Sequence, residues 1–230
     1  MKKIFVYSML LALLSAVPTE IEAKRYAKSS MRTKTKTERN VSKSNVEKQG
    51  NDDYVDLGLP SGTLWATKNI GASSPEGYGN YYAWGETSPK SSYTRDNYTG
   101  EDITSDELPA GRDAATANWG SDWRMPSIEQ IKELVDGCKW TWTSRNGVNG
   151  QLGRSMYNNK TIFLPAAGYR YGASLYDAGS YGNYWSRTRY DSGYAYGLGF
   201  KSGGVDYGNG YYYDNRYDGH SVRAVRVSQH

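Results

Sequence analysis

The alternation of large and small residues in segment 194–200 limits the fold more than any other feature of this sequence. Every second position holds a large residue, namely Tyr194, Tyr196, Leu198 and Phe200, and alanine or glycine stands between them. Side chains of a β-strand point to opposite faces in turn, so this pattern predicts a strand with one packed face and one closely approached face. We therefore expect Tyr194 and Tyr196 to pack at the edge of the core.

Short strands and turns are predicted for most of the sequence around this segment. Strands are short runs of apolar, aromatic or β-branched residues bounded by Gly, Asn, Asp, Pro or Ser. The predicted strands are residues 54–59 and 63–67, which form a hairpin around Pro60–Gly62, then 139–142, 161–164, 168–171, 182–186 and a closing strand at 221–227.

Helix signals occur only in the middle of the sequence. Ser127 and Gln130 form a capping box before an apolar stripe at helical spacing, and Gly137 ends it. Asp113 is a suitable N-cap for one or two further helical turns. Residues 71–112 have no sustained periodicity and predict long irregular structure. The sequence therefore predicts an α+β fold with short antiparallel strands, one or two helices and long irregular loops.

The N-terminal residues predict export. Residues 1–23 combine a positive start, an apolar run too short for a comfortable membrane span and small residues for cleavage, so we interpret them as a secretory signal peptide. Residues 24–52 are basic and almost without large apolar side chains, which predicts a disordered linker. The folded domain is expected at residues 53–230. Export argues against nucleic acid as a partner, and no membrane insertion is expected after signal cleavage.

Catalytic and metal-binding chemistry finds little support. Zinc needs clustered His and Cys, but the chain has only Cys138, His220 and His230. No pair of carboxylates resembles the acid and base of a glycosidase. Asp214, Asn215 and Asp218 could offer oxygens to calcium, although such residues also suit turns. We predict a protein that is not an enzyme, with no catalytic residue, metal or cofactor, and a buried structural thiol at Cys138.

Tyrosine is concentrated near the carboxyl end. Residues 151–230 hold fourteen of the twenty-two tyrosines. The three consecutive tyrosines at 211–213 cannot all face inward, because side chains alternate in a strand. Tyrosine supplies a large contact area with few rotors to freeze, and its ring stacks on apolar faces of sugars. The predicted ligand-binding residues are Tyr190, Tyr207, Tyr211, Tyr212, Tyr213, Asn215, Arg216 and Tyr217.

Several phrases resemble a known family. They are VDLGLPSGTLWATKNIG (55–71), YYAWGET (81–87), DAATANWGSDWRMPS (113–127), FLPAAGYR (163–170), GNYWS (182–186) and GHSVRAVR (219–226). Together they resemble the Fibrobacter succinogenes major paralogous domain, common in exported proteins of Bacteroidetes. The resemblance covers nearly all of residues 53–230.

The resemblance implies a C-type-lectin-like compact domain. Such a fold pairs its two ends in one sheet, which would place the hairpin at 54–67 beside the strand from Ser221, and it carries a long irregular region that faces the ligand. The calcium motifs of true C-type lectins are absent. Trp119, Trp123 and Trp185 are assigned to the core, with Arg124 and Arg170 as hydrogen-bonding framework residues.

The sequence thus predicts an exported module that binds a glycan or an extracellular protein, in carbohydrate binding or adhesion, without metal or catalysis. Its location after export could be extracellular, the cell surface or the periplasm. A structural or fimbria-associated subunit that uses the same face for protein–protein contact is the alternative, and an enzyme is a third. Residues 190–220 also resemble the variable segments that diversity-generating retroelements produce in some lectin-fold proteins.

Overall fold

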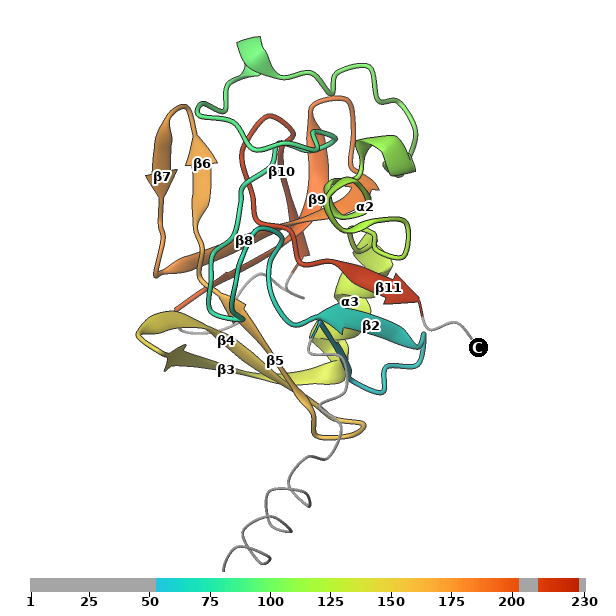
Figure 1. The fold of residues 1–230 in the computed structure, drawn as a ribbon, viewed down its shortest axis with the longest axis vertical. Helices are drawn as coiled ribbons and strands as arrows, with labels where there is room; N and C mark the ends of the chain where they lie inside the picture. The colour runs from blue at the N-terminus through green and yellow to red at the C-terminus, as the bar shows by residue number, and fades with distance from the viewer. Residues whose placement is uncertain (1–52, 203–210, 228–230) are drawn as a thin grey trace, which may run out of the picture. The chain divides into compact units, whose positions relative to one another are not determined.

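The computed structural model describes residues 53–202 and 211–227 (Figure 1). All of these residues belong to one compact unit. The predicted signal peptide and linker lie outside the described residues. Among those described, no helix has the length and apolar character needed to cross a membrane.

The two ends of the described chain meet in one small antiparallel sheet. Strands β1 (Tyr54–Asp56) and β2 (Thr63–Ala66) form the predicted hairpin, and β11 (Val225–Val227) pairs with the other edge of β2. The turn of the hairpin closes where the N–H of Gly62 donates to the carbonyl of Leu59 at 2.9 Å. The expected hairpin and its pairing with the closing strand are confirmed, although β11 is shorter than predicted.

Both predicted helices form, and their caps explain where they begin. Helix α3 (Ile128–Gly137) starts with the Ser127 capping box, in which the N–H of Gln130 donates to Ser127 and the Gln130 side chain accepts from the Ser127 N–H. Helix α2 (Ala114–Trp119) starts at Asp113, whose carboxylate accepts from two N–H groups of the first turn.

The long segment before α2 is irregular, as predicted. Between β2 and α2 the regular elements are two short 3-10 turns, η1 (Arg95–Asn97) and η2 (Ala110–Arg112). Backbone pairing holds this segment to the rest of the domain. The N–H of Tyr82 donates to the carbonyl of His220 at 2.9 Å, and the N–H of Tyr93 donates to the carbonyl of Gly172 at 2.8 Å.

A second sheet has the order β3-β4-β5, from β3 (Cys138–Arg145), β4 (Val148–Ser155) and β5 (Thr161–Pro165). Strand β4 lies in a segment that was not predicted as a strand, because glycines replace the expected large residues. The ring of Trp140 packs so closely on Gly153 that an added Cβ would lie 2.7 Å from it. The indole supplies the packing area that Gly153 lacks.

The carboxyl-terminal third forms two further sheets. Strands β6 (Tyr169–Tyr171) and β7 (Ser174–Tyr176) make a two-stranded hairpin, in which β7 was not predicted. Strands β8 (Tyr181–Arg189), β9 (Tyr194–Lys201) and β10 (Tyr211–Asn215) form a sheet in the order β10-β9-β8.

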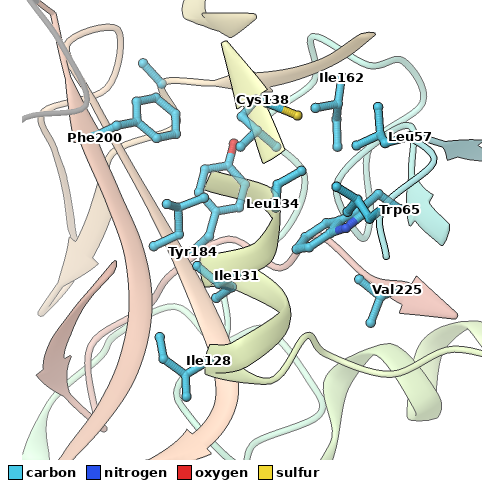
Figure 2. Close-up of a cluster of buried hydrophobic side chains, with 14 residues drawn as sticks. Leu57, Trp65, Ile128, Ile131, Leu134, Cys138, Ile162, Tyr184, Phe200 and Val225 are labelled. Atoms are coloured by element: carbon cyan, nitrogen blue, oxygen red, sulfur yellow. The ribbon is translucent and has the colours of Figure 1, made fainter. Parts of the chain in front are cut away.

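The main core surrounds α3 (Figure 2). Ile131 and Leu134 of α3 lie between Tyr184 and Phe200 on one side and Trp65 of the terminal sheet on the other. Burial raises the pKa of the Cys138 thiol to about 11, consistent with a structural role.

A second apolar cluster lies on the other face of β8 and β9. Trp185 and Ala195 are buried there, so both faces of this sheet are covered near the cluster. Trp123 is also buried, and Trp119 packs against the cluster while remaining half-buried. The guanidinium of Arg124 donates to the Asp113 carboxylate and to the carbonyl of Leu108, which confirms its framework role.

Small antiparallel sheets with two α-helices in the described part fit the predicted α+β class. The finer assignment to a C-type-lectin-like fold stays a prediction.

Candidate functional site

Tyr190 lies in the turn between β8 and β9, and Asp191 fixes this turn. The Oδ1 atom of Asp191 accepts hydrogen bonds at 2.8 Å from the N–H groups of Gly193 and Tyr194. The N–H groups of Tyr190 and Asp191 both donate to the carbonyl of Tyr194 at 3.1 Å. A carboxylate that accepts from the backbone two residues on is a common way to build a turn. The position of Tyr190 is therefore set by local hydrogen bonds.

Four aromatic rings from this turn and from β9 and β10 contact one another. Tyr190 and Tyr213 stack with ring centroids 4.2 Å apart and planes 3° from parallel. The Tyr194 ring meets Tyr213 at 5.7 Å in an edge-to-face arrangement, and Tyr196 meets Tyr190 in the same way at 5.1 Å. The strand register explains why rings from β9 and β10 meet, because Tyr213 of β10 pairs with Tyr196 of β9 across the sheet. We call Tyr190, Tyr194, Tyr196 and Tyr213 the tyrosine cluster.

Three members of the tyrosine cluster are exposed. Tyr190 is 44% exposed, Tyr194 39% and Tyr213 50%. The expectation that at least one of the three consecutive tyrosines meets solvent is confirmed by Tyr213. The prediction that Tyr194 packs at the core edge is wrong, because it starts β9 beside a turn and lies beyond the core. Tyr196 is partly buried against the α3 core, as predicted.

A second group of aromatic side chains lies on the β6–β7 hairpin and the turn after β10. Tyr171 and Tyr176 are exposed, and Tyr171 lies 6.5 Å from the half-buried ring of Tyr217. This contact follows from backbone pairing, because Arg170 and Gly219 exchange two hydrogen bonds of 2.8 Å.

Tyr217 links the second group to the tyrosine cluster. Burial raises the pKa of Tyr217. The N–H of the neighbouring Arg216 donates to the carbonyl of Gly193 at 3.0 Å, which joins the turn that carries Tyr217 to the β8–β9 turn of the tyrosine cluster. The β6–β7 turn, the β8–β9 turn and the turn after β10 also gather in the upper part of Figure 1, close to the long irregular loop. The exposed tyrosines of this region therefore form one neighbourhood.

The structure corrects the assignment of Arg216 to a ligand-binding surface. Its side chain is 1% exposed. Its Nε donates to the hydroxyl of Tyr98 at 3.1 Å, Nη1 to the carbonyl of Ser192 at 3.0 Å, and Nη2 to the carbonyls of Gly100 and Ile103 at 2.6 and 3.1 Å. The guanidinium also lies 4.4 Å from the ring of Trp84. Arg216 thus ties the turn of the tyrosine cluster to the long loop, and its donors are used internally.

Asn215 has a mainly internal role as well. Its side chain is half-buried and donates from Nδ2 to the Asp218 carboxylate at 3.2 Å. Asp218 is buried, and within the described residues its Oδ1 atom has no hydrogen-bond partner. Burial raises the pKa of Asp218 to about 6, and the nearby Asp214 carboxylate adds to this while His220 opposes it.

Half-buried Asp214 and buried His220 lie next to Asp218 and complete a polar group with it. The ring of His220 is fully buried and stacks on Trp185 at 4.0 Å. Its Nε2 lies 3.4 Å from Asp214 Oδ2. Burial opposes ionisation of Asp214, but the hydrogen bond and charge of His220 outweigh it and hold the pKa of Asp214 below its usual value. This group underlies the turn that carries Tyr217.

The remaining predicted site residues are placed only in part. Tyr207 lies outside the described residues. Tyr211 and Tyr212 of β10 pair with Leu198 and Gly197 of β9, and the structure describes the backbone of these two tyrosines. Within the described ranges, no group of three or more His, Cys, Asp or Glu side chains could hold a metal ion.

Four exposed tyrosines were not predicted as site residues, namely Tyr157, Tyr171, Tyr176 and Tyr194. Two of them, Tyr171 and Tyr194, could have been found. A signal was present, because each adjoins a glycine of a hairpin turn, Gly172 and Gly193. A tyrosine next to such a glycine stands at the tip of its hairpin, where neighbouring strands no longer cover it.

Comparison with known proteins gives one match. A family model described as a domain of unknown function, DUF8237, matches residues 142–225, which is less than half of the chain. The match includes the tyrosine cluster and the Asp214–His220 group. A search of curated proteins found no match, and a search of solved structures also found none. The resemblance to the Fibrobacter succinogenes paralogous family stays a prediction.

Proposed function

We propose that the chain is an exported binding protein that recognises a glycan or an extracellular protein through the tyrosine cluster, Tyr171 and Tyr217. In this proposal it acts without a metal ion and without catalysis. The observation that carries the proposal is the stacked pair of Tyr190 and Tyr213, whose rings are about half exposed.

The chemistry of the cluster suits recognition. Each ring has two main side-chain rotors, and the ring–ring contacts restrict them before a partner arrives, so little conformational entropy remains to be lost on binding. Each ring combines an apolar face for a sugar or an aliphatic side chain with a hydroxyl that donates and accepts hydrogen bonds.

The framework beneath the cluster supports the same interpretation. The turn that holds Tyr190 is closed by Asp191 and held from below by Arg216 through the carbonyl of Ser192. Asp218 and His220, which could have served acid–base chemistry, are buried under the surface instead of facing a substrate.

The proposal is tested by binding of the full chain to arrays of glycans and of extracellular proteins. We expect selective binding that is lost in the double variant Tyr190→Ser/Tyr213→Ser. The matched control is Tyr157→Ser, since Tyr157 is 56% exposed and lies in the turn after β4. Equal binding by the double variant and the control, or no binding to either array, contradicts the proposal.

A specific feature favours the alternative of a structural subunit. Strand β7 pairs with β6 in a two-stranded sheet, and Leu175 and Tyr176 on it are exposed. An exposed edge strand with apolar side chains can pair with another chain. In that case sedimentation would reveal self-association that increases with concentration and is lost in Leu175→Lys.

A further inference from the structure

A pocket of about 240 Å³ lies apart from the tyrosine cluster, between the terminal sheet and α2. Its lining residues are Asp53, Lys68, Trp119 and Trp123. Asp53 precedes β1, Lys68 follows β2, and the two tryptophans come from the end of α2 and the loop after it. None of these residues belongs to the proposed recognition surface.

Two indole rings form fixed walls of this pocket. Trp119 and Trp123 meet edge to face, with centroids 5.1 Å apart and planes at 76°. Trp123 is anchored in the second apolar cluster, and Trp119 packs against that cluster while half-buried. The half-buried Trp119 offers apolar surface that a small ring can contact, and Trp123, which is 9% exposed, adds a small part of that surface.

Among the described residues that line the pocket, the two charged groups are opposite in sign. Asp53 supplies a carboxylate and Lys68 an ammonium group. Arg226, nearby, already lies over the rings of Tyr54 and Trp123, and its guanidinium is 3.5 Å from the Asp122 carboxylate. An anionic or cationic ligand therefore gains little net attraction, whereas a neutral ligand can use both hydrogen-bonding groups.

We propose that this pocket binds one pyranose ring of a neutral carbohydrate. The apolar face of the sugar packs on the indoles, the Asp53 carboxylate accepts hydrogen bonds from hydroxyl groups, and the Lys68 ammonium donates to a sugar oxygen. The volume matches a single ring better than a long ligand, because drug-sized ligands occupy pockets of roughly 300–1,000 Å³. The pocket would be a sugar subsite independent of the tyrosine cluster.

The test uses the full chain labelled with ¹⁵N and a panel of methyl pyranosides of glucose, galactose, mannose and N-acetylglucosamine. At least one member, at millimolar concentration, is expected to shift the indole N–H resonances of Trp119 and Trp123. Trp140 is the internal control, because its indole N–H donates to the carbonyl of Val135 at 3.1 Å outside the pocket. Its resonance is expected to stay in place.

Two variants keep the test specific. Asp53 is exposed and Lys68 half-buried, so Asp53→Asn and Lys68→Gln change the pocket without disturbing the core. Because hydrogen bonds to charged groups are the stronger ones, Asp53→Asn is expected to weaken sugar binding about tenfold. The variant Tyr190→Ser/Tyr213→Ser is expected to bind the same sugar as tightly as the natural chain.

Three results would overturn the proposal. One is a panel in which no sugar shifts the Trp119 and Trp123 resonances. Another is binding that is unchanged in both Asp53→Asn and Lys68→Gln. The third is loss of these shifts in the Tyr190→Ser/Tyr213→Ser variant, which would assign the sugar to the recognition surface instead. Failure of that surface to bind its own ligand leaves the pocket proposal standing.

Discussion

Two groups of tyrosines in this domain have opposite environments. Tyr81, Tyr93 and Tyr184 are buried, and each hydroxyl donates to a carbonyl. Tyr81 donates to Ala167 at 2.5 Å, Tyr93 to Tyr81 at 2.5 Å and Tyr184 to Pro165 at 2.6 Å. These tyrosines stabilise the fold, because a buried carbonyl without a donor is costly.

The tyrosine cluster differs in what its rings contact. Tyr190, Tyr194 and Tyr213 are exposed, and within the described part of the chain their ring contacts are with each other and with Tyr196. Tyr196 is the member that packs against the described core. The comparison teaches that a tyrosine-rich sequence can serve two purposes in one domain, and that position relative to a hairpin turn separates them.

The largest effect is expected for Arg216→Met, which breaks the link between the long irregular loop and the turn that carries the tyrosine cluster. Arg216 bonds both to Tyr98 of the long loop and to Ser192 in the turn of the cluster. Its removal takes a donor from the buried carbonyls of Gly100 and Ile103, of which that of Gly100 keeps the Ile103 N–H, so we expect a loss of about 3 kcal/mol in the free energy of unfolding.

Urea denaturation measures this loss, and Arg95→Met is the control. The Arg95 side chain is 80% exposed, so its substitution should change stability by less than about 0.5 kcal/mol. Similar values for the two variants would show that Arg216 does not hold the loops.

The next prediction concerns how stability depends on pH through the buried carboxyl group of Asp218, which follows Tyr217 in the chain. The folded-state pKa of Asp218, about 6, lies above the value of about 3.9 for an unfolded aspartate. The native state therefore binds this proton more tightly, and the resulting stability is fully present below about pH 3.9 and lost as the pH rises through about 6. The side chain in the Asp218→Asn variant is neutral at every pH, so the variant resembles the natural protein with Asp218 protonated.

Thermal melts of both proteins from pH 4 to pH 8 check this sign. At pH 8 we expect Asp218→Asn to be more stable than the natural chain by about 2–3 kcal/mol, and at pH 4 the difference should vanish. The lowered pKa of Asp214 contributes stability in the opposite direction, which is lost as the pH falls. A difference that does not depend on pH would contradict this account of Asp218.

A smaller effect on stability is expected when one tyrosine of each group loses its hydroxyl oxygen. Tyr184→Phe removes a donor from the carbonyl of Pro165 in the interior, so we expect a loss of about 1–3 kcal/mol. Tyr213→Phe removes an exposed hydroxyl and should cost less than about 0.5 kcal/mol. Equal losses in chemical denaturation would remove the distinction.

Local patterns in the sequence were enough to predict part of this structure. The Ser127 capping box, the Asp113 cap and the alternating strand at 194–200 each act through neighbouring residues, and each prediction of an element was confirmed. Strand β4 was missed because the packing surface that it needs comes from other strands, such as the ring of Trp140 beside Gly153.

The candidate site was less predictable for the same reason. The burial of Arg216 depends on carbonyls at residues 100 and 103, more than a hundred positions away, and no short-range pattern predicts that contact. The Asp214–His220 pair likewise depends on the turn after β10 folding over Trp185. The exposure of Tyr190 and Tyr213 was predicted because strand alternation and turn chemistry are local.

The central claim is that Tyr190 and Tyr213 are displayed for contact and do not support the fold. The free energy of unfolding of Tyr190→Ser/Tyr213→Ser, compared with that of Tyr93→Ser in the interior, tests it most directly. We predict a loss of about 1 kcal/mol for the double variant, the value of one aromatic pair, and about 3–5 kcal/mol for Tyr93→Ser. A loss in the double variant as large as that of Tyr93→Ser would show that the cluster is packing, and would contradict the account.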